Sequence, residues 1–214
     1  MKLFDEFRAA ADPVRAVKMS AYMRDQFPFL GIQTPNRKNL SKEALKQLGA
    51  EPVDWDFINK CWEQPEREFQ YLALDYLTKI KHKLNKSDVV KLKKLAVTKS
   101  WWDTVDGLDQ VVGDIALRHP EVNKTLLQWS TDGNFWLRRL AIDHQLGRNE
   151  KTDTELLAAI IVNNLGQKKF FINKAIGWAL RDYSKTNPQW VRNFITAHKN
   201  QLSPLSIKEA SKHL

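Results

Sequence analysis

Apolar side chains recur along this chain with the spacing of one face of an α-helix. Four stripes keep a spacing of about 3.6 residues, and they run through residues 72–84, 105–116, 137–144 and 172–180. Asp132 and Gly133 form a turn dipeptide, but no alternation of apolar and polar residues flanks it, so a β-hairpin is not expected. The pattern predicts roughly a dozen short helices and no strand.

Prolines and glycines mark where these helices begin and end. Proline fits the first helical turn, where its missing N–H would have no intrahelical partner. Seven of the eight prolines stand at such a position, and only Pro28 resists that interpretation. The seven are Pro13, Pro35, Pro52, Pro65, Pro120, Pro188 and Pro204. Gly49, Gly147 and Gly166 each follow an apolar stripe and are predicted to end a helix.

A loose internal repeat groups the helices. Four short segments align, and their fourth positions are Tyr71, Asp106, Arg139 and Lys174, separated by 35, 33 and 35 residues. A helix pair of this length is the unit of an α-solenoid, and the degenerate match suits HEAT-like repeats. We therefore expect an all-α protein, a single domain over residues 1–214, in which these four positions share one concave surface.

The composition is that of a globular protein with a surplus of basic residues. Of 214 residues, 43% are apolar and 28% charged, and 34 Lys and Arg against 25 Asp and Glu give a net charge of +9. The isoelectric point of about 9.6 favours a polyanionic partner such as nucleic acid. Eight tryptophans are many for this length.

Several classes of protein are excluded by the same composition. The single cysteine, Cys61, forms no internal disulfide and no thiolate zinc site, and the five histidines lack metal-ligand spacing. No apolar run approaches the roughly 18 residues of a membrane span, and the N-terminal segment carries acids where a signal peptide has its apolar core. We expect a soluble intracellular protein.

The repeat also brings candidate functional residues close together. Trp102 lies four residues before Asp106, and Trp178 lies four residues after Lys174, so each is one helical turn from a repeat position. Trp101 sits beside Trp102, and adjacent residues on a helix cannot both point into one core. We expect one of the two to face a groove.

Plainer interpretations exist for each of these residues. Asp106 lies between Asp103 and Asp109 and resembles a surface or capping carboxylate, and Arg139 follows Arg138 in a pair typical of a solvated face. Lysine-rich runs elsewhere are typical of exposed helix faces. The remaining tryptophans that we assign to the core are Trp55, Trp62, Trp129 and Trp190.

Five segments together resemble one protein family. They are SAYMRDQFPFLGIQTP (20–35), KSWWDTVD (99–106), WLRRLAI (136–142), FFINKAIGWALRDYSKTNP (170–188) and LSPLSIKEASKHL (202–214). On these segments the chain resembles the AlkD-type DNA alkylation-repair glycosylases, which are built of HEAT-like repeats. The likeness runs nearly end to end, and WWDTVD and KAIGWALR are too long and chemically unusual for chance agreement.

The resemblance implies a function and a set of roles. The function is hydrolysis of the N-glycosidic bond of positively charged alkylated purines, N7-methylguanine and N3-methyladenine, in duplex DNA during base-excision repair. By matching positions, Asp106 is the catalytic aspartate, Trp102 and Trp178 face the lesion nucleotide, and Arg139 lies in the same cleft. The expected DNA contacts are Tyr22 on the cleft rim and Gln33, Thr34, Arg181 and Lys185 on the phosphate backbone. The resemblance further implies a concave DNA-binding face. A monomer is the simplest expectation, and we expect no cofactor or metal and a cytoplasmic protein associated with the nucleoid through DNA.

The chemistry of a cationic purine suits these residues. The alkylated base leaves as a neutral molecule, so no general acid is needed, and the cationic, oxocarbenium-like sugar is the species that requires stabilisation. A carboxylate near C1′ stabilises that charge and orients water, tryptophan faces attract a cation, and Arg139 would hold a phosphate.

Two other functions stay open at this level. A non-catalytic duplex-DNA or lesion-binding protein on the same scaffold needs the basic face but not Asp106, and a HEAT-like protein adaptor needs an apolar groove instead. Lys174 is the one lysine that the repeat places close enough for Schiff-base lyase chemistry, which we do not expect.

Overall fold

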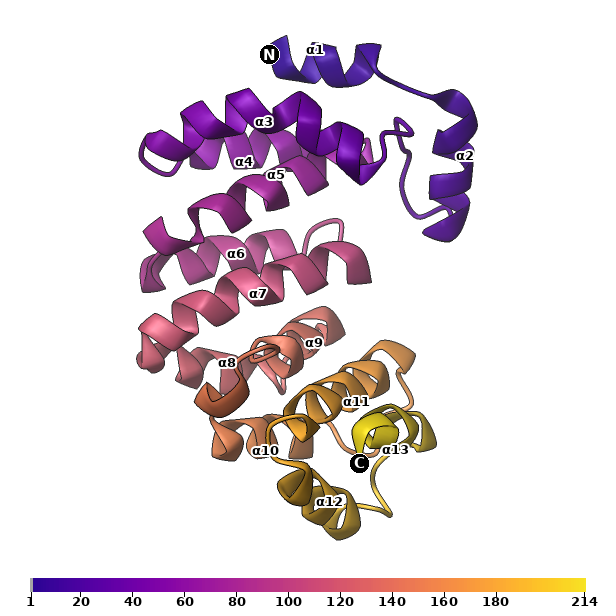
Figure 1. The fold of residues 1–214 in the computed structure, drawn as a ribbon, viewed down its shortest axis with the longest axis vertical. Coiled ribbons are helices and arrows are strands. Elements are labelled where there is room, and N and C mark those ends of the chain that lie inside the picture. The colour runs from indigo at the N-terminus through magenta and orange to yellow at the C-terminus, as the bar shows by residue number, and fades with distance from the viewer. Residues whose placement is uncertain (1) are drawn as a thin grey trace. The chain divides into compact units, whose positions relative to one another are not determined.

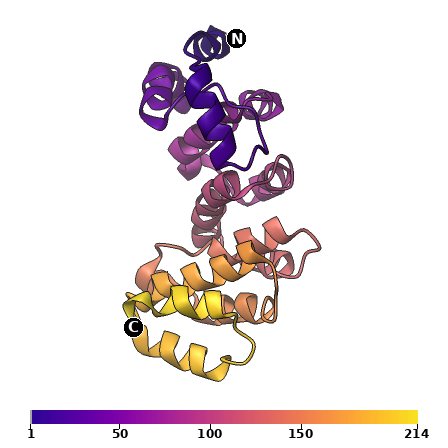
Figure 2. The same ribbon diagram turned by 90° about the vertical axis from the view of Figure 1, so that its right-hand side faces the viewer.

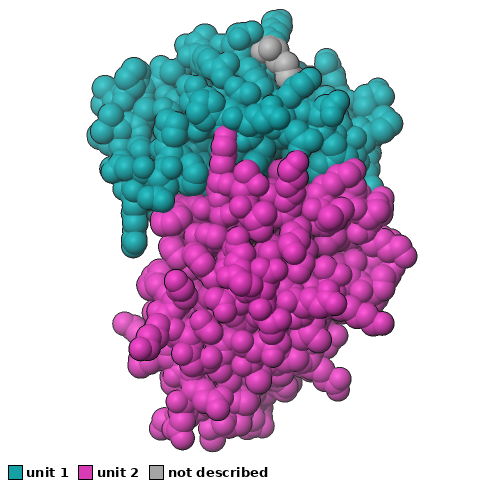
Figure 3. All heavy atoms as spheres, turned by 180° about the vertical axis from the view of Figure 1, so that it is seen from behind, with its two compact units in different colours: residues 1–84 teal, residues 85–214 magenta. Residues whose placement is uncertain are grey.

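The chain is helical throughout the part that its computed structural model describes, residues 2–214 (Figure 1). Over that range it forms thirteen α-helices and five short 3₁₀-helices, with no strand. The predicted all-α class, built of helical repeats, is confirmed. None of the helices in residues 2–214 combines the length and the apolar character that crossing a membrane requires. The chain divides into two compact units, residues 1–84 (unit 1) and residues 85–214 (unit 2) (Figure 3).

Unit 1 is built around an aromatic core. Its helices are α1 (Lys2–Ala9), α2 (Pro13–Tyr22), α3 (Thr34–Ala50), α4 (Trp55–Glu63) and α5 (Arg67–Ile80), followed by a 3₁₀ turn over Lys81–Lys83. The rings of Phe4 and Phe69 lie 4.7 Å apart, and those of Phe57 and Tyr76 lie 5.4 Å apart. Helix α2 buries no side chain, so it stands apart from this core.

A buried carboxylate shapes the loop between α2 and α3. Glu68, on α5, is fully buried and accepts hydrogen bonds from the backbone N–H groups of Leu30, Gly31 and Ile32, at 2.9, 2.8 and 3.0 Å. Gly31 has a φ of +89°, and a side chain there would collide with the backbone oxygen of Asp12. Both features fix the path of the chain from α2 into α3.

Unit 2 stacks its longer helices side by side (Figures 1 and 2). Its α-helices are α6 (Val89–Ala96), α7 (Trp102–Arg118), α8 (Asn123–Trp129), α9 (Phe135–Asp143), α10 (Thr154–Val162), α11 (Phe170–Ser184), α12 (Pro188–Ala197) and α13 (Pro204–Ala210). The 3₁₀ turns cover Lys86–Asp88, Pro120–Val122, Asn149–Lys151 and Ser211–His213. Helix α9 packs against α7 and α11, and α11 packs in turn against α13. Gly113 on α7 lets the backbone of His144 approach so closely that a side chain would collide with it.

Contacts in unit 2 recur at the period expected from the sequence. Hydrogen bonds join residues 33 to 35 positions apart, so equal positions of consecutive repeats touch. The pairs are Asp106 with Arg139, Gly113 with Arg148, Ser130 with Asn164, Asn173 with Ser206, Gly147 with Asp182, and Lys174 with Glu209. This recurrence is what stacked helix-pair repeats produce. That the whole chain forms a single domain stays a prediction.

The helix boundaries follow most of the proline and glycine signals. Five of the seven prolines lie in the first turn of an α- or 3₁₀-helix, as predicted, whereas Pro52 and Pro65 lie in bends. The prediction is wrong for Pro52 because the side chain of Asp54 caps α4, which therefore begins at Trp55. It is wrong for Pro65 because the side-chain amide of Gln70 donates to the backbone oxygen of Gln64 and holds the bend in place. Helix α5 therefore begins at Arg67.

The predictions for the glycines and tryptophans are partly confirmed and partly wrong. Gly147 and Gly166 adopt positive φ values of +78° and +69° beyond the ends of α9 and α10, as expected. Gly49 lies inside α3, which ends one residue later. Trp62 and Trp129 are buried as predicted, but Trp55 and Trp190 are only half-buried, so their assignment to the core is wrong.

Candidate active site

An aspartate and an arginine from consecutive repeats form the centre of the site. Arg139 on α9 donates from Nε and Nη2 to the two carboxylate oxygens of Asp106 on α7, both at 2.7 Å. Its Nη1 donates to the backbone oxygen of Phe171 at 2.7 Å. The side chain of Arg139 is 1% exposed and that of Asp106 is 24% exposed. The paired guanidinium therefore holds the Asp106 carboxylate in one orientation while part of that carboxylate still reaches solvent.

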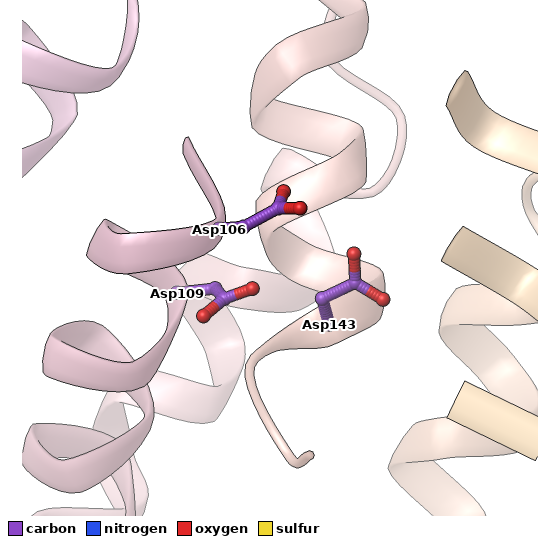
Figure 4. Close-up of side chains that lie close together, drawn as sticks. All are labelled: Asp106, Asp109 and Asp143. Carbon is purple, nitrogen blue, oxygen red and sulfur yellow. The ribbon is translucent and has the colours of Figure 1, made fainter. Parts of the chain in front are cut away.

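Two further carboxylates lie close to Asp106 (Figure 4). Asp109 on α7 and Asp143 on α9 are buried, and one oxygen from each of Asp106, Asp109 and Asp143 lies within 4.8 Å of the others. Asp143 Oδ2 lies 3.6 Å from Nη2 of Arg139. Neither residue was expected in the site from the sequence. The signal was the helical spacing, since Asp109 follows Asp106 by three residues and Asp143 follows Arg139 by four.

The charges of this cluster do not balance when every group is ionised. Burial raises the pKa of Asp109 well above its ordinary value, and the charges of Asp143 and Asp106 raise it further. Burial likewise raises the pKa of Asp143 to about 7, against the opposing effect of Arg139. Protonation within the Asp109–Asp143 pair relieves the excess of negative charge around the single guanidinium.

Asp106 is left as the carboxylate best suited to be an anion. Burial raises its pKa above the ordinary 3.8, but the hydrogen bond and the charge of Arg139 oppose that rise. Burial also lowers the pKa of Arg139, yet the bonded Asp106 and the charges of Asp143 and Asp109 outweigh it and raise the pKa overall. The guanidinium therefore stays charged. The guanidinium of Arg139 already lies between Asp106 and Asp143. The three carboxylates are therefore neutralised by this arginine and by protons, and they do not need a metal ion.

Trp178 adds an aromatic face beside the pair. The guanidinium carbon of Arg139 lies 5.1 Å from its ring centroid, and Nζ of Lys174 lies 5.8 Å from it. Trp102 is the first residue of α7 and is half-buried. Trp101 packs on Trp136 and Phe171 with ring centroids 5.7 and 5.3 Å away, so Trp101 belongs to an aromatic cluster.

The structure shows contacts of Arg139 that were not expected from the sequence. We expected Arg139 on an exposed surface with Asp106 and Lys174, where it would hold a phosphate. Asp106 and Lys174 are partly exposed, but the guanidinium of Arg139 is buried, and its Nε, Nη1 and Nη2 all bind groups of the protein. These contacts orient the Asp106 carboxylate, and the expected phosphate contact of Arg139 stays a prediction.

The other predicted residues of unit 2 lie on α11 or just beyond its end. Lys174 and Arg181 both form ion pairs with Glu209 of α13, at 2.8 and 2.9 Å. Lys185 is exposed and lies 3.4 Å from Asp182. The ammonium of Lys174 is thus engaged by a carboxylate, which does not favour it as a Schiff-base nucleophile.

The predicted residues of unit 1 lie around α2 and the start of α3. Tyr22 is the last residue of α2 and is 73% exposed. It lines a groove of about 180 Å³, together with Tyr71 and Phe29. Gln33 and Thr34 are exposed where α3 begins.

Comparisons with known proteins agree with the fold and with the resemblance. The family model described as DNA alkylation repair enzyme matches residues 3–214. A solved structure described as a predicted DNA alkylation repair enzyme from Enterococcus faecalis is 40% identical, with a TM-score of 0.89. The alignment covers 95% of this chain and 96% of that one. The comparison with curated proteins gave no match. The family match spans nearly the whole chain, and the chain therefore belongs to the DNA alkylation repair enzyme family.

Proposed function

We propose that this protein is a DNA glycosylase that releases positively charged alkylated purines, such as N7-methylguanine and N3-methyladenine, from duplex DNA. One observation carries the proposal. A partly exposed carboxylate, Asp106, is held by two 2.7 Å hydrogen bonds from a buried arginine beside the ring of Trp178. The family membership supplies the context, which is repair of alkylated DNA.

The main requirement of this reaction is that the protein stabilise a cation. When the C1′–N bond of the alkylated nucleotide breaks, its electron pair goes to the base, which leaves neutral. The sugar carries the positive charge in an oxocarbenium-like state. Asp106 stabilises that charge and orients a water molecule whose oxygen bonds to C1′, and the proton that this water loses passes to the carboxylate or to solvent. The product is an abasic site.

Arg139 contributes by fixing this carboxylate before the substrate arrives. The bidentate pair allows Asp106 a single orientation, so little reorganisation remains for the reaction itself. Trp102 and Trp178 offer aromatic faces, each worth about 0.5–2 kcal/mol toward a cationic nucleotide. These interactions act on charge, so uncharged lesions such as uracil are expected to be poor substrates.

Base release from methylated DNA tests this proposal. Duplex DNA methylated at guanine N7 is incubated with the wild type and with Asp106→Asn, and free 7-methylguanine is measured. Asp114→Asn is the matched control, because Asp114 lies on the same helix, is also 24% exposed and also pairs with an arginine, Arg118, at 3.0 Å. We expect release by the wild type and the control, and loss of most release in Asp106→Asn with its DNA affinity nearly unchanged.

A second candidate function is decided by the same assay. A non-catalytic binder of duplex DNA or of lesions would bind the duplex in a salt-dependent manner and release no base. Full activity of a folded Asp106→Asn variant would remove the proposed mechanism, and absence of release by the wild type would favour the binder.

A further inference from the structure

A second charged cluster lies between α11 and α13 in unit 2. Glu209 of α13 has a side chain that is 6% exposed, and three cations surround its carboxylate. Oε1 lies 2.8 Å from Nζ of Lys174, and Oε2 lies 2.9 Å from both Nη1 of Arg181 and Nζ of Lys212. We call Lys174, Arg181 and Lys212 the cation triad.

The sequence builds this cluster by helical spacing and by one glycine. Lys174 and Arg181 are seven residues apart, so they lie on the same face of α11, and Gly177 lies between them on that face. A Cβ on Gly177 would stand 2.5 Å from Cβ of Glu209 and 3.1 Å from the backbone oxygen of Ser206. The missing side chain is therefore what lets α13 bring Glu209 between the two cations.

The cluster keeps a net positive charge and unused donors. Three cations around one carboxylate leave a surplus of two positive charges. A lysine ammonium has three N–H donors and a guanidinium has five, whereas one nitrogen of each side chain contacts Glu209. The side chains of Lys174, Arg181 and Lys212 are 25%, 29% and 45% exposed, while the carboxylate beneath them is buried. Hydrogen bonds from Lys174 and Lys212 lower the pKa of Glu209 to about 2, so it stays ionised at neutral pH.

The triad is connected to the candidate active site through one ring. Lys174 lies over Trp178, and Arg139, which binds Asp106, lies over the same ring. An anion bound by the triad would therefore lie near the nucleotide on which Asp106 acts. A phosphodiester matches the triad, because it presents two charged oxygens to lysine and arginine donors.

We propose that Lys174, Arg181 and Lys212, assembled by the buried Glu209, bind the DNA backbone at a phosphate close to the lesion nucleotide. This inference rests on the proposed function, because it takes duplex DNA as the ligand. It assigns Glu209 a positioning role, and it adds Lys174 and Lys212 to Arg181 as phosphate contacts.

The charge of Glu209 allows a decisive test. If the triad only joined α11 to α13, removing the carboxylate would add a positive charge to the protein and strengthen its attraction to DNA. If Glu209 assembles the triad, the same change disperses the three cations and weakens binding. The two explanations predict opposite signs for Glu209→Gln.

Salt-dependent binding to an undamaged duplex measures both effects. The variants are Glu209→Gln and Lys212→Gln, and the control variants are Glu121→Gln and Lys86→Gln, a 2.9 Å ion pair elsewhere in unit 2. Affinity is measured by fluorescence anisotropy between about 50 and 200 mM salt. We expect Lys212→Gln to reduce the slope of log K against log salt by about 0.9, the value for one phosphate contact. We expect Glu209→Gln to weaken binding by about threefold to tenfold, the effect of losing one hydrogen bond of ordinary strength. The control variants should show neither the reduced slope nor the weakened binding.

Each result decides the proposal. An unchanged slope in Lys212→Gln, whose side chain is 45% exposed and whose loss does not threaten folding, would overturn it. So would tighter binding by a Glu209→Gln variant that circular dichroism shows to be folded. Because the duplex is undamaged, the test is independent of base release. Triad-dependent binding without release would overturn the glycosylase proposal alone, and release without triad dependence would overturn the triad alone.

Discussion

Replacing Arg139 by methionine tests how the buried cluster is held together. The side chain is 1% exposed, and it makes three 2.7 Å hydrogen bonds, two to Asp106 and one to the backbone oxygen of Phe171. Methionine fills much of the same volume but leaves Asp106 and the Phe171 oxygen without their donor. Breaking a buried ion pair from one side costs about 3–5 kcal/mol. Because Asp106 is 24% exposed and regains some hydration, we expect the lower end, about 3 kcal/mol.

The opposite substitution should cost much less. Asparagine in place of Asp106 still accepts a hydrogen bond from Arg139 through its amide oxygen, and it removes one of three crowded carboxylates. We expect Asp106→Asn to lose about 1 kcal/mol. The double variant contains neither charged group of the pair, so no charge is left without its partner. The two losses of unfolding free energy should therefore not add, and a coupling energy of about 1–3 kcal/mol is expected.

Thermal unfolding at neutral pH measures these differences. For a protein of this size, a loss of about 3 kcal/mol lowers Tm by roughly 6–12 °C. The control is Arg118→Met, which breaks a more exposed pair with Asp114 and should cost about 1 kcal/mol or less. Base release should fall in Arg139→Met because Asp106 loses its fixed orientation, whereas affinity for undamaged duplex should change little. Equal losses in the two single variants, or additive losses in the double variant, would refute this account of the cluster.

Two further predictions concern pH and packing. Burial raises the pKa of Asp143 to about 7 from an ordinary 3.8, so the folded protein retains a proton that the unfolded chain releases, and this part of its stability is lost as pH rises from about 4 to 7. Asp143→Asn removes the titration, so urea unfolding should show the variant gaining stability relative to wild type between about pH 4 and 7, and a pH-independent difference would contradict this. Gly113→Ala would push α7 away from the backbone of His144 and should cost about 1–3 kcal/mol. Gly133→Ala, which meets nothing within 4 Å, is its control in thermal unfolding, and equal melting temperatures for the two variants would count against the close approach.

The helices and their repeat were accessible from the sequence because both leave periodic signals. Apolar spacing indicated the helix faces, and prolines marked most of the helix starts. The alignment of Asp106 with Arg139 at a separation of 33 residues predicted that they share a face, but not that they bond directly. A repeat period states which positions are equivalent, whereas direct contact depends on the distance between neighbouring helices.

Burial of polar groups was the part that the sequence concealed. Arg139, next to Arg138, has the pattern of a solvated pair, yet its guanidinium is enclosed because three acceptors converge on it from α7, α9 and α11. Glu209 showed no signal of its own, because two of its three partners lie on α11 and the third lies in the C-terminal 3₁₀ turn. Such clusters are set by tertiary packing, and their members are distant in the sequence.

The loop anchored by Glu68 has a consequence for how this protein tolerates changes in length. Surface loops usually accept insertions, because few of their backbone groups are committed to partners. Here three consecutive amides are bound to one buried carboxylate, so an inserted residue would shift the register of the loop and detach at least one of them. The number of residues from Leu30 to Ile32 is therefore fixed by Glu68 of α5, and natural variation in length should avoid this segment even though it has no regular secondary structure.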